Sequence, residues 1–291
     1  MTTYPIICAP MNRVSDLTLA LAVHKANCIP SFVIYNYQDN KWDEDFLKFK
    51  TEIAEYVSIT GSHHFVVALK SELLLNRPIV IETILKAKPA FIEIFDIVDI
   101  SDKKLTNMFA LFRKAGIKVI YKMLGARDIG ELNQHIDGLV IKGPDAAARV
   151  GNLRIELPEK IKRARSMYPH LYIIASGGIA TSQDIRDCLD AGANVVSLGT
   201  VFALSKESSI SDETKAKLLD ISFSEIKNIG QEHQNAIVFS TEPDIDGNHT
   251  AGLEAGLRSP TKGHVFMGKA IDTITEVKTV EQIVAELTCN L

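Results

Sequence analysis

The stretch LYIIASGGIATSQDIRDCLDAGANVVSLGT, residues 171–200, decides the fold. It begins with an apolar run that ends in Ser176-Gly177-Gly178, and it closes with a second apolar run that ends in Gly199-Thr200. The segment 181–191 between them has apolar residues at helical spacing and starts with Thr181, a residue that commonly caps a helix. The stretch therefore predicts a β-strand, an α-helix and a second strand parallel to the first.

The same alternation continues along most of the chain. The apolar runs are continuous, which is typical of parallel strands buried on both faces, and amphipathic segments such as 43–59, 101–115 and 155–168 lie between them. Eight such units in about 200 residues predict a (β/α)8 TIM barrel of the α/β class. A doubly wound sheet is the alternative, because periodicity does not show closure. The eight runs are 5–10, 28–35, 64–69, 90–95, 117–123, 137–143, 171–176 and 194–200.

The rhythm of strands and helices stops after residue 205. We expect residues 1–291 to form a single domain, with the barrel over about 5–208 and a C-terminal helical and loop extension over about 209–291. The extension is predicted to hold a polar helix over about 211–230, an apolar run at 236–240, a loop over 241–263 and a final helix over about 279–288.

The overall composition excludes several classes of function. Lys plus Arg total 32 against 36 Asp plus Glu, so the formal net charge is −4 and no basic stripe favours nucleic acid. No apolar run reaches the ~18 residues of a membrane span, and the first residues do not resemble a signal peptide. The four cysteines are scattered without a CxxC pair, which favours free thiols. We therefore expect a soluble, cytoplasmic protein.

Two consecutive predicted strands end in small residues, and this pattern predicts an anion site. In (β/α)8 barrels, the loops after the last two strands commonly bind phosphate. Glycine lets the backbone approach an anion, N–H groups at a helix start can bind it, and Ser176 and Thr200 add hydroxyl donors. We predict a bound phosphate monoester; the alternative is that the glycines only form tight turns. The pattern does not distinguish FMN from a phosphosugar or pyridoxal phosphate.

Longer stretches of the sequence resemble a known family and so favour one of these ligands. The clearest are PIICAPMNRVSDLTLALAVHKA (5–26), IIASGGIATSQDIRDCLDAGANVVSLGTVFALSKES (173–208) and TITEVKTVEQIVAEL (273–287), and the segments 112–128 and 135–151 resemble the same family more weakly. These stretches resemble the nitronate monooxygenase family, the 2-nitropropane dioxygenase-like flavoproteins, which also includes flavin-dependent enoyl-acyl carrier protein reductases. The resemblance covers most of residues 5–208 and the last helix.

The resemblance implies that FMN lies across the C-terminal end of the barrel. The backbone at Ala9, Pro10 and Met11 would then lie beside the isoalloxazine ring. A cation such as Lys122 at the end of the fifth strand would stabilise the reduced flavin near its N1/O2 edge. The remaining residues expected to bind the cofactor are Lys142, Gly143 and Asp145 after the sixth strand, with Ser176, Gly177, Gly178, Gly199 and Thr200 around the phosphate.

One stretch departs from the family pattern. Where the family has Gly-x-Glu-Ala-Gly-Gly-His-x-Gly after the sixth strand, this chain has GPDAAARVG at 143–151, so that alanines replace both central glycines. The histidine, which is the base of the nitronate oxidisers, is replaced by Arg149. Arginine stays protonated and cannot accept a proton, but it can polarise or clamp a substrate carboxylate, phosphate or carbonyl. Arg149 is therefore the candidate catalytic residue for substrate polarisation.

Other chemically active residues are weaker candidates. Glu93, Asp96, Tyr35, Asn36 and Tyr121 lie in or after predicted strands, where each is also explained as a loop, cap or core residue.

Metal binding is not expected. The pair His63-His64 precedes the third strand, at the end of the barrel away from the site, and is interpreted as structural. The stretch 244–248 begins like a calcium loop but lacks the glycine and glutamate that such a loop needs. The serines lack the histidine and acid of a hydrolase triad.

Three functions remain open. The first is an FMN-dependent oxidoreductase that acts on a small organic substrate, with NADH or NADPH as an electron donor. The second is an FMN-binding protein without turnover, which acts with a partner. The third is a flavin-free barrel lyase or isomerase whose glycine loops bind the phosphate of a phosphosugar. A homodimer is among the expected assemblies, although the sequence gives no oligomeric state.

Overall fold

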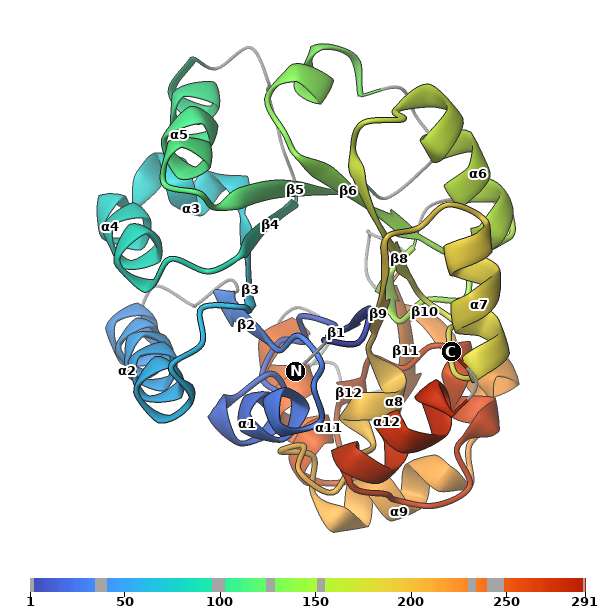
Figure 1. The fold of residues 1–291 in the computed structure, drawn as a ribbon. Helices are drawn as coiled ribbons and strands as arrows, with labels where there is room; N and C mark the ends of the chain where they lie inside the picture. Colours follow the sequence, from blue (N-terminus) through green and yellow to red (C-terminus); the bar gives the residue numbers. More distant parts are fainter. Residues whose placement is uncertain are drawn as a thin grey trace.

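The computed structural model describes residues 3–34, 41–95, 103–123, 129–150, 155–229, 234–239, 249–289 and 291. Within them, eight parallel strands surround a central axis and helices cover the outside (Figure 1). The strands are β1 (Ile6–Cys8), β2 (Ser31–Ile34), β3 (Val66–Lys70), β4 (Phe91–Phe95), β5 (Lys118–Met123), β6 (Gly138–Lys142), β8 (Tyr172–Ser176) and β9 (Val195–Leu198). Seven of the eight fall within the apolar runs of the sequence, and β3 extends one residue beyond its run, to Lys70.

The sheet closes into a barrel. Its strand order is β1-β9-β8-β6-β5-β4-β3-β2. Between β1 and β2 a parallel bridge joins Ile7 to Ile29: the Ile29 N–H donates to the carbonyl of Ile6 at 2.9 Å, and the Cys8 N–H donates to the carbonyl of Ile29 at 2.9 Å. The predicted (β/α)8 barrel is therefore confirmed, and the doubly wound sheet is excluded.

A ring of helices surrounds the sheet. It contains α1 (Leu17–Lys25), α2 (Trp42–Thr60), α3 (Ser71–Asn76), α4 (Pro78–Ala87), α5 (Lys103–Lys114), the 3₁₀ turn η2 (Gly130–Gln134), α6 (Leu157–Met167), α7 (Ser182–Asp190) and α8 (Thr200–Ala203). Thr181 and Asp184 form the capping box at the start of α7, as the sequence predicts. No helix in the described part of the chain is long and apolar enough to cross a membrane.

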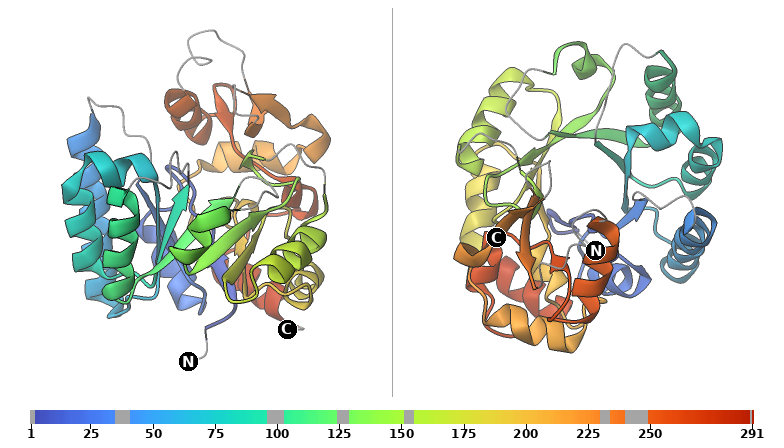
Figure 2. Two further views of the ribbon diagram at one scale, coloured as in Figure 1. Left: turned by 90° about the horizontal axis from the view of Figure 1, so that it is seen from above. Right: turned by 180° about the vertical axis from the view of Figure 1, so that it is seen from behind.

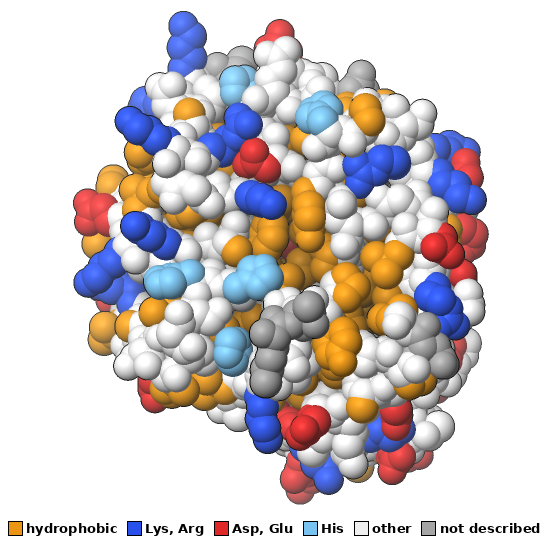
Figure 3. Space-filling model, in the orientation of Figure 1, with side chains coloured by type: hydrophobic (Ala, Val, Ile, Leu, Met, Phe, Trp, Pro, Cys, Tyr) orange, Lys and Arg blue, Asp and Glu red, His pale blue; other side chains and the backbone are white. Residues whose placement is uncertain are grey.

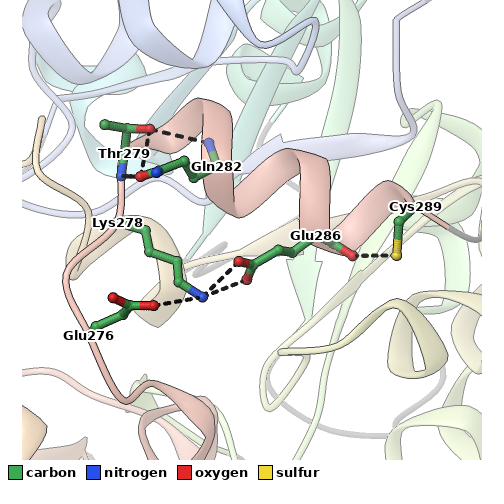
Figure 4. A network of polar contacts seen from close by, with 6 residues as sticks. All are labelled: Glu276, Lys278, Thr279, Gln282, Glu286 and Cys289. Carbon is green, nitrogen blue, oxygen red and sulfur yellow. Dashed lines mark hydrogen bonds and ion pairs between the residues drawn. The ribbon is translucent and has the colours of Figure 1, made fainter.

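The last helix completes this ring. Because α8 is a single turn, it leaves a space that α12 (Val280–Thr288) fills by packing against α1, α7 and α8. Figure 4 shows how α12 begins: Thr279 and Gln282 form a capping box, and Lys278 Nζ lies 2.7 Å from Glu286 Oε1 and 3.4 Å from Glu276 Oε1. The helix expected over 279–288 thus packs in the barrel's helix layer.

The rest of the extension includes a small antiparallel sheet of β10 (Lys227–Ile229), β11 (Gln234–Val238) and β12 (His264–Val265). The helices and 3₁₀ turns of this part of the chain are α9 (Asp212–Leu219), η3 (Phe223–Glu225), α11 (His249–Arg258) and η4 (Lys269–Thr273). The expected helix over 211–230 is wrong beyond Leu219. Ser222 caps the new turn η3, and β10 then pairs with β11. In Figure 2, β10–β12 and α11 lie at the end of the barrel opposite the two chain termini.

Two sets of inward-facing side chains fill the barrel axis. The lower set is apolar and forms a floor of Ile7, Ile29, Val66, Phe91, Ile120, Val140, Ile174 and Val195. Side chains alternate along a strand, so the inward residues nearer the C-terminal ends lie above that floor. These include Glu93, Lys122, Lys142, Ser176 and Ser197, and this is where the strands change from apolar to polar.

Candidate functional site

A cavity lies above the apolar floor, at the C-terminal ends of the strands. Its strand-end lining comes from all eight barrel strands, including Val33 of β2 and Ala68 of β3, and its other wall comes from the C-terminal extension. The predicted site residues that line it are Ala9, Pro10, Met11, Lys122, Lys142, Arg149, Ser176, Gly177, Gly178, Gly199 and Thr200. Residues predicted from the start of the chain, from its middle and from positions 176–200 therefore line one cavity, as expected if they form a single binding site.

Glycines shape the β8 side of the cavity. Gly177 has φ +98° and Gly178 has φ +78°, a region that side chains disfavour. A Cβ on Gly177 would collide with the Cβ of Ala146, and one on Gly178 would lie 3.3 Å from the Cβ of Asp145. Across the cavity, a Cβ on Gly199 would lie 3.7 Å from the Cβ of Ala9. The absent Cβ atoms let the loop after β8 lie against the loop after β6, and let Gly199 lie against Ala9.

The same loop presents backbone donors. Among the hydrogen bonds of the described residues, none uses the N–H groups of Gly177, Gly178 or Ile179. Thr200 Oγ1 accepts a hydrogen bond from the Gly268 N–H at 3.0 Å, which leaves the hydroxyl hydrogen for another acceptor. Successive backbone N–H groups at a turn can form a concave anion site. The loop therefore offers donors of the kind that bind a phosphate group.

These donors differ from the ones expected from helix starts. The helix α7 begins only at Ser182, and its cap uses its own groups: Asp184 Oδ2 accepts from the N–H groups of Ala180 and Thr181 at 2.9 Å each. The helix α8 has four residues and provides little dipole. The anion-binding potential therefore comes from the loop backbone between β8 and α7.

Charged side chains form the opposite side of the cavity. Glu93 on β4 is 3% exposed and accepts a hydrogen bond from Lys122 Nζ on β5 at 2.7 Å. The predicted flavin cation is therefore already paired with a carboxylate that the sequence left as a weak candidate. A buried pair of this kind is costly to break, because the remaining charge would lose its partner.

Lys142 extends this charged side toward β8. Its Nζ donates to the carbonyl of Ala147 at 2.6 Å. The pKa of Lys142 is lowered well below its ordinary value, mainly because the surrounding protein desolvates the amine, and further by the positive charge of Lys122. Glu93 opposes the shift and Arg149 adds to it. The environment therefore disfavours the charged form of this amine more than it does that of an exposed lysine.

Arg149 reaches the cavity from a short strand, β7 (Ala148–Arg149). This strand pairs with β11, with Arg149 opposite Gln234, and so joins the barrel loop to the C-terminal sheet. Ala148 has φ +54°, the left-handed region that glycine prefers. The backbone thus keeps a glycine-like conformation at one of the positions where alanine replaces a glycine of the family pattern.

Gly143 and Asp145 do not line the cavity. The N–H of Gly143 donates to the carbonyl of Ser176 at 2.8 Å, and a Cβ on Gly143 would lie 3.1 Å from the carbonyl oxygen of Gly177. Asp145 Oδ2 lies 3.3 Å from Lys269 Nζ, and this pairing raises the pKa of Lys269. Gly143 therefore holds the loop after β6 against the end of β8, and Asp145 holds it against η4. Neither residue is part of the cavity lining.

The extension contributes residues that sequence reasoning missed. Leu253, Leu257, Val265, Phe266, Met267 and Ala270 line the cavity. The Gly268 N–H to Thr200 bond and the Lys269 N–H to Asp145 bond, at 2.9 Å, hold this wall against the barrel. The apolar character of 264–271 was the available signal, but only the folded chain shows that it faces the strand ends.

Other sequence candidates lie elsewhere. Tyr121 belongs to the apolar core between the sheet and the helices. His63 and His64 precede β3, at the end of the barrel that Figure 3 shows, where histidine side chains gather around an apolar centre. Asp96, Tyr35, Asn36 and 244–248 fall outside the described residues. Within the described part of the chain, no group of three or more His, Cys, Asp or Glu side chains could hold a metal ion.

The closed barrel and the donor-rich loop at its C-terminal end define an α/β-barrel protein with a cavity at the C-terminal ends of its strands. The family model "Nitronate monooxygenase" matches residues 81–229, just over half of the chain. The protein belongs to the nitronate monooxygenase family, and the resemblance seen in the sequence is confirmed.

Solved structures share the whole fold. FabK from Thermotoga maritima has a TM-score of 0.81 and 18% identity, over 99% of this chain and 92% of that one. A nitroalkane oxidase from Streptomyces ansochromogenes has a TM-score of 0.76 and 18% identity, over 99% and 96%. At this identity the likeness concerns the fold.

A curated relative matches only locally. Inosine-5'-monophosphate dehydrogenase from Halalkalibacterium halodurans is 54% identical over 41 residues, which are 14% of this chain and 8% of that protein. The chain thus spans less than a tenth of the length of this relative, and the match concerns a short segment only.

Proposed function

We propose that this member of an oxidoreductase family is an FMN-dependent enzyme that acts on a small organic substrate. The observation that carries the proposal is the loop at Gly177, Gly178 and Ile179, which lines the cavity and whose backbone N–H groups donate to no other described residue. Such a loop suits the terminal phosphate of FMN. Ser176, Gly199 and Thr200 would complete the phosphate contacts.

The rest of the cavity suits the flavin ring. Ala9, Pro10 and Met11 line it at the end of β1, and Gly199 lies against Ala9 and Met11 without a side chain between them. When bound, FMN supplies redox chemistry that the side chains lack. The apolar wall made by Phe266 and Met267 would exclude water from the reacting groups.

Arg149 is proposed to orient the substrate. It is permanently charged, it lines the cavity, and β7 holds its backbone against β11. A guanidinium in this place can bind a carboxylate or polarise a carbonyl or nitro group. We propose NADH or NADPH as the electron donor, docking at the open face of the flavin.

The proposal is tested by purifying the chain without added cofactor and recording its visible spectrum. We expect a yellow protein that releases FMN on denaturation and that is bleached by NADH or NADPH under anaerobic conditions. Recovery of the colour with an enoyl thioester would identify an electron acceptor, and bleaching by a nitroalkane without any nucleotide would identify an oxidised substrate. A colourless protein that does not take up added FMN would reject the proposal, and binding without reduction by either nucleotide would favour an FMN-binding protein without turnover.

A further inference from the structure

The wall that the C-terminal extension adds to the cavity is held to the barrel in two different ways. On the β6 side the contacts include backbone: β7 pairs with β11, and the Lys269 N–H donates to the carbonyl of Asp145 at 2.9 Å. On the β1 side they are made by side chains: Arg13 Nη2 lies 2.9 Å from Glu254 Oε1, and the Ser209 hydroxyl donates to the carbonyl of Arg13 at 2.9 Å. Side-chain contacts of this kind can break and re-form while the strand pairing persists.

We propose that the ion pair between Arg13 and Glu254 is a latch that controls how ligands enter and leave the cavity. When the pair is formed, α11 is held against the turn after β1; when it breaks, the seam between them opens. Both residues are positioning residues, since neither is part of the cavity lining. The inference rests on the proposed function only in naming FMN as the ligand that the latch retains.

The arginine belongs to the turn that also lines the cavity. A hydrogen bond from the Val14 N–H to the carbonyl of Met11, at 3.1 Å, closes this turn, and Met11, Asn12 and Val14 line the cavity. Arg13 has φ +63°, a backbone conformation that residues other than glycine adopt rarely. Asp45 near the start of α2 binds both terminal nitrogens of the guanidinium, at 2.6 and 2.8 Å. The barrel therefore fixes the guanidinium, and its partner on the extension is the part that can leave.

The glutamate belongs to the helix that forms the wall. On α11, Leu253 and Leu257 lie about one turn apart, and both are buried and line the cavity. Glu254 follows Leu253 directly, and its side chain is 25% exposed. A second cation, Lys41, lies 3.8 Å from its other carboxylate oxygen and is 50% exposed. A shift of Glu254 away from Arg13 would therefore carry the apolar face of α11 away from the strand ends.

The charges around the latch are balanced, which makes the pair reversible. Two cations face two carboxylates in this cluster. When Glu254 leaves, Arg13 keeps its bidentate bond to Asp45, so no buried charge loses every partner. The guanidinium side chain is 21% exposed, so its pair with Glu254 is partly solvated and weaker than a fully buried pair. Opening the latch therefore costs little compared with unfolding.

The first test measures opening without any ligand. Leu253→Cys places a thiol on the cavity face of α11, in a chain whose exposed cysteine is removed by Cys289→Ser. The other cysteines are buried, so the rate of reaction with iodoacetamide, an uncharged reagent, reports how often the seam opens. Adding Glu254→Gln should speed this reaction about 10-fold, because the neutral amide cannot replace a charged partner of Arg13. Equal rates with and without Glu254→Gln would overturn the inference.

The matched control breaks an ion pair on the other side of the wall. Lys269→Met removes the pair between Lys269 Nζ and Asp145 Oδ2, which lie 3.3 Å apart, but keeps the backbone hydrogen bond of residue 269. This variant should leave the labelling rate of the Leu253→Cys chain unchanged. An acceleration equal to that of Glu254→Gln would show that the wall loosens as a whole, and the latch would be rejected.

A salt titration tests the same pair without a change at Glu254. At about 1 M sodium chloride the Debye length falls to about 3 Å, so a partly solvated ion pair is weakened. Salt should therefore speed the labelling of the Leu253→Cys chain and have little effect once Glu254→Gln is added. This measurement gives an answer even if Glu254→Gln does not fold, and a rate that salt does not change would overturn the inference.

The second test separates a latch from a wall contact that only supports the cofactor. FMN association and dissociation are followed by stopped-flow quenching of flavin fluorescence. Because the pair lies outside the cavity lining, Glu254→Gln should raise both rate constants by the same factor, about 10-fold, and leave the Kd nearly unchanged. Faster dissociation with unchanged association, and hence a higher Kd, would identify a supporting contact and overturn the inference.

The two tests distinguish this inference from the proposed function. A chain that does not bind FMN, but whose labelling responds to Glu254→Gln and to salt, would lose the proposed function and keep the latch. Conversely, a chain that binds FMN with association and dissociation rates that Glu254→Gln does not change would keep the proposed function and lose only the latch.

Discussion

The two sides of the cavity present different chemical groups: one side presents backbone, and the other presents charged side chains. The β8–β9 side is backbone: Gly177, Gly178 and Gly199 let neighbouring loops approach closely, and the loop after β8 contributes N–H groups. The β4–β6 side is made of charged side chains, with the Glu93–Lys122 pair and the amine of Lys142. A backbone site can bind any phosphate monoester of suitable shape, whereas a set of ionised groups selects for the chemistry of the reactant. We propose that the backbone side holds the cofactor and that the charged side selects the substrate.

The largest effect is expected when the charged side loses one member of its pair. Lys122→Met leaves the carboxylate of Glu93, which is 3% exposed, without its partner. Breaking a buried pair in this way costs about 3–5 kcal/mol of unfolding free energy. Urea denaturation measures the change.

An exposed ion pair provides the matched control. Arg163→Met breaks the exposed Arg163–Glu159 pair within one helix and should cost about 0.3–0.5 kcal/mol. The double variant Glu93→Gln/Lys122→Met removes both charges and should recover part of the lost stability. Equal costs for Lys122→Met and Arg163→Met would show that the cavity pair is solvated like a surface pair.

On the backbone side, a single methyl group should weaken flavin binding. Gly177→Ala places a Cβ against Ala146 and forces alanine to φ +98°. We expect the Kd for FMN to rise about 100-fold, equivalent to about 2.7 kcal/mol. Quenching of FMN fluorescence measures the Kd.

Gly61→Ala is the control for backbone strain alone. Gly61 also has a positive φ, +64°, but a Cβ there has no atom within 4 Å. It follows α2 and does not line the cavity. This variant should lower stability and leave the Kd for FMN unchanged. If Gly177→Ala also left the Kd unchanged, the loop would not be the phosphate site.

The smallest effect concerns the loop that joins the two sides. Ala148 has φ +54°, so Ala148→Gly should relieve strain and stabilise the protein by about 0.5–1 kcal/mol. Ala147 lies next to it with no positive φ, and Ala147→Gly should instead destabilise by about 0.4–1 kcal/mol. Urea denaturation of both variants gives the comparison. Similar changes of one sign would show that the conformation of Ala148 costs nothing.

The sequence was most informative where the backbone itself makes the structure. Continuous apolar runs predicted all eight strands, and the strand-end glycines at 177, 178 and 199 pointed to the place where the cavity lies. Their predicted contact with a phosphate stays a prediction. The capping box at Thr181 could also be predicted, because it depends only on two residues that lie three positions apart in the chain.

The sequence was less informative where a property depends on distant neighbours. Glu93 and Lys122 are 29 positions apart, and only the register of β4 and β5 brings them together. The helix expected up to residue 230 ends at Leu219, and residues 227–229 instead form β10. This strand forms because it pairs with β11, a contact with a later part of the chain that the local helical pattern does not show. The wall made by Phe266 and Met267 depends on how the extension folds back over the barrel, which periodicity does not show.

The central claim is that the loop after β8 binds the phosphate of FMN. The most direct test compares the Kd of FMN with that of riboflavin, which has the same ring and ribityl chain but no phosphate. We predict that FMN binds at least about 100-fold more tightly, as expected when several charge-assisted hydrogen bonds are lost together. Equal affinity for the two flavins, or binding of neither, would contradict the account.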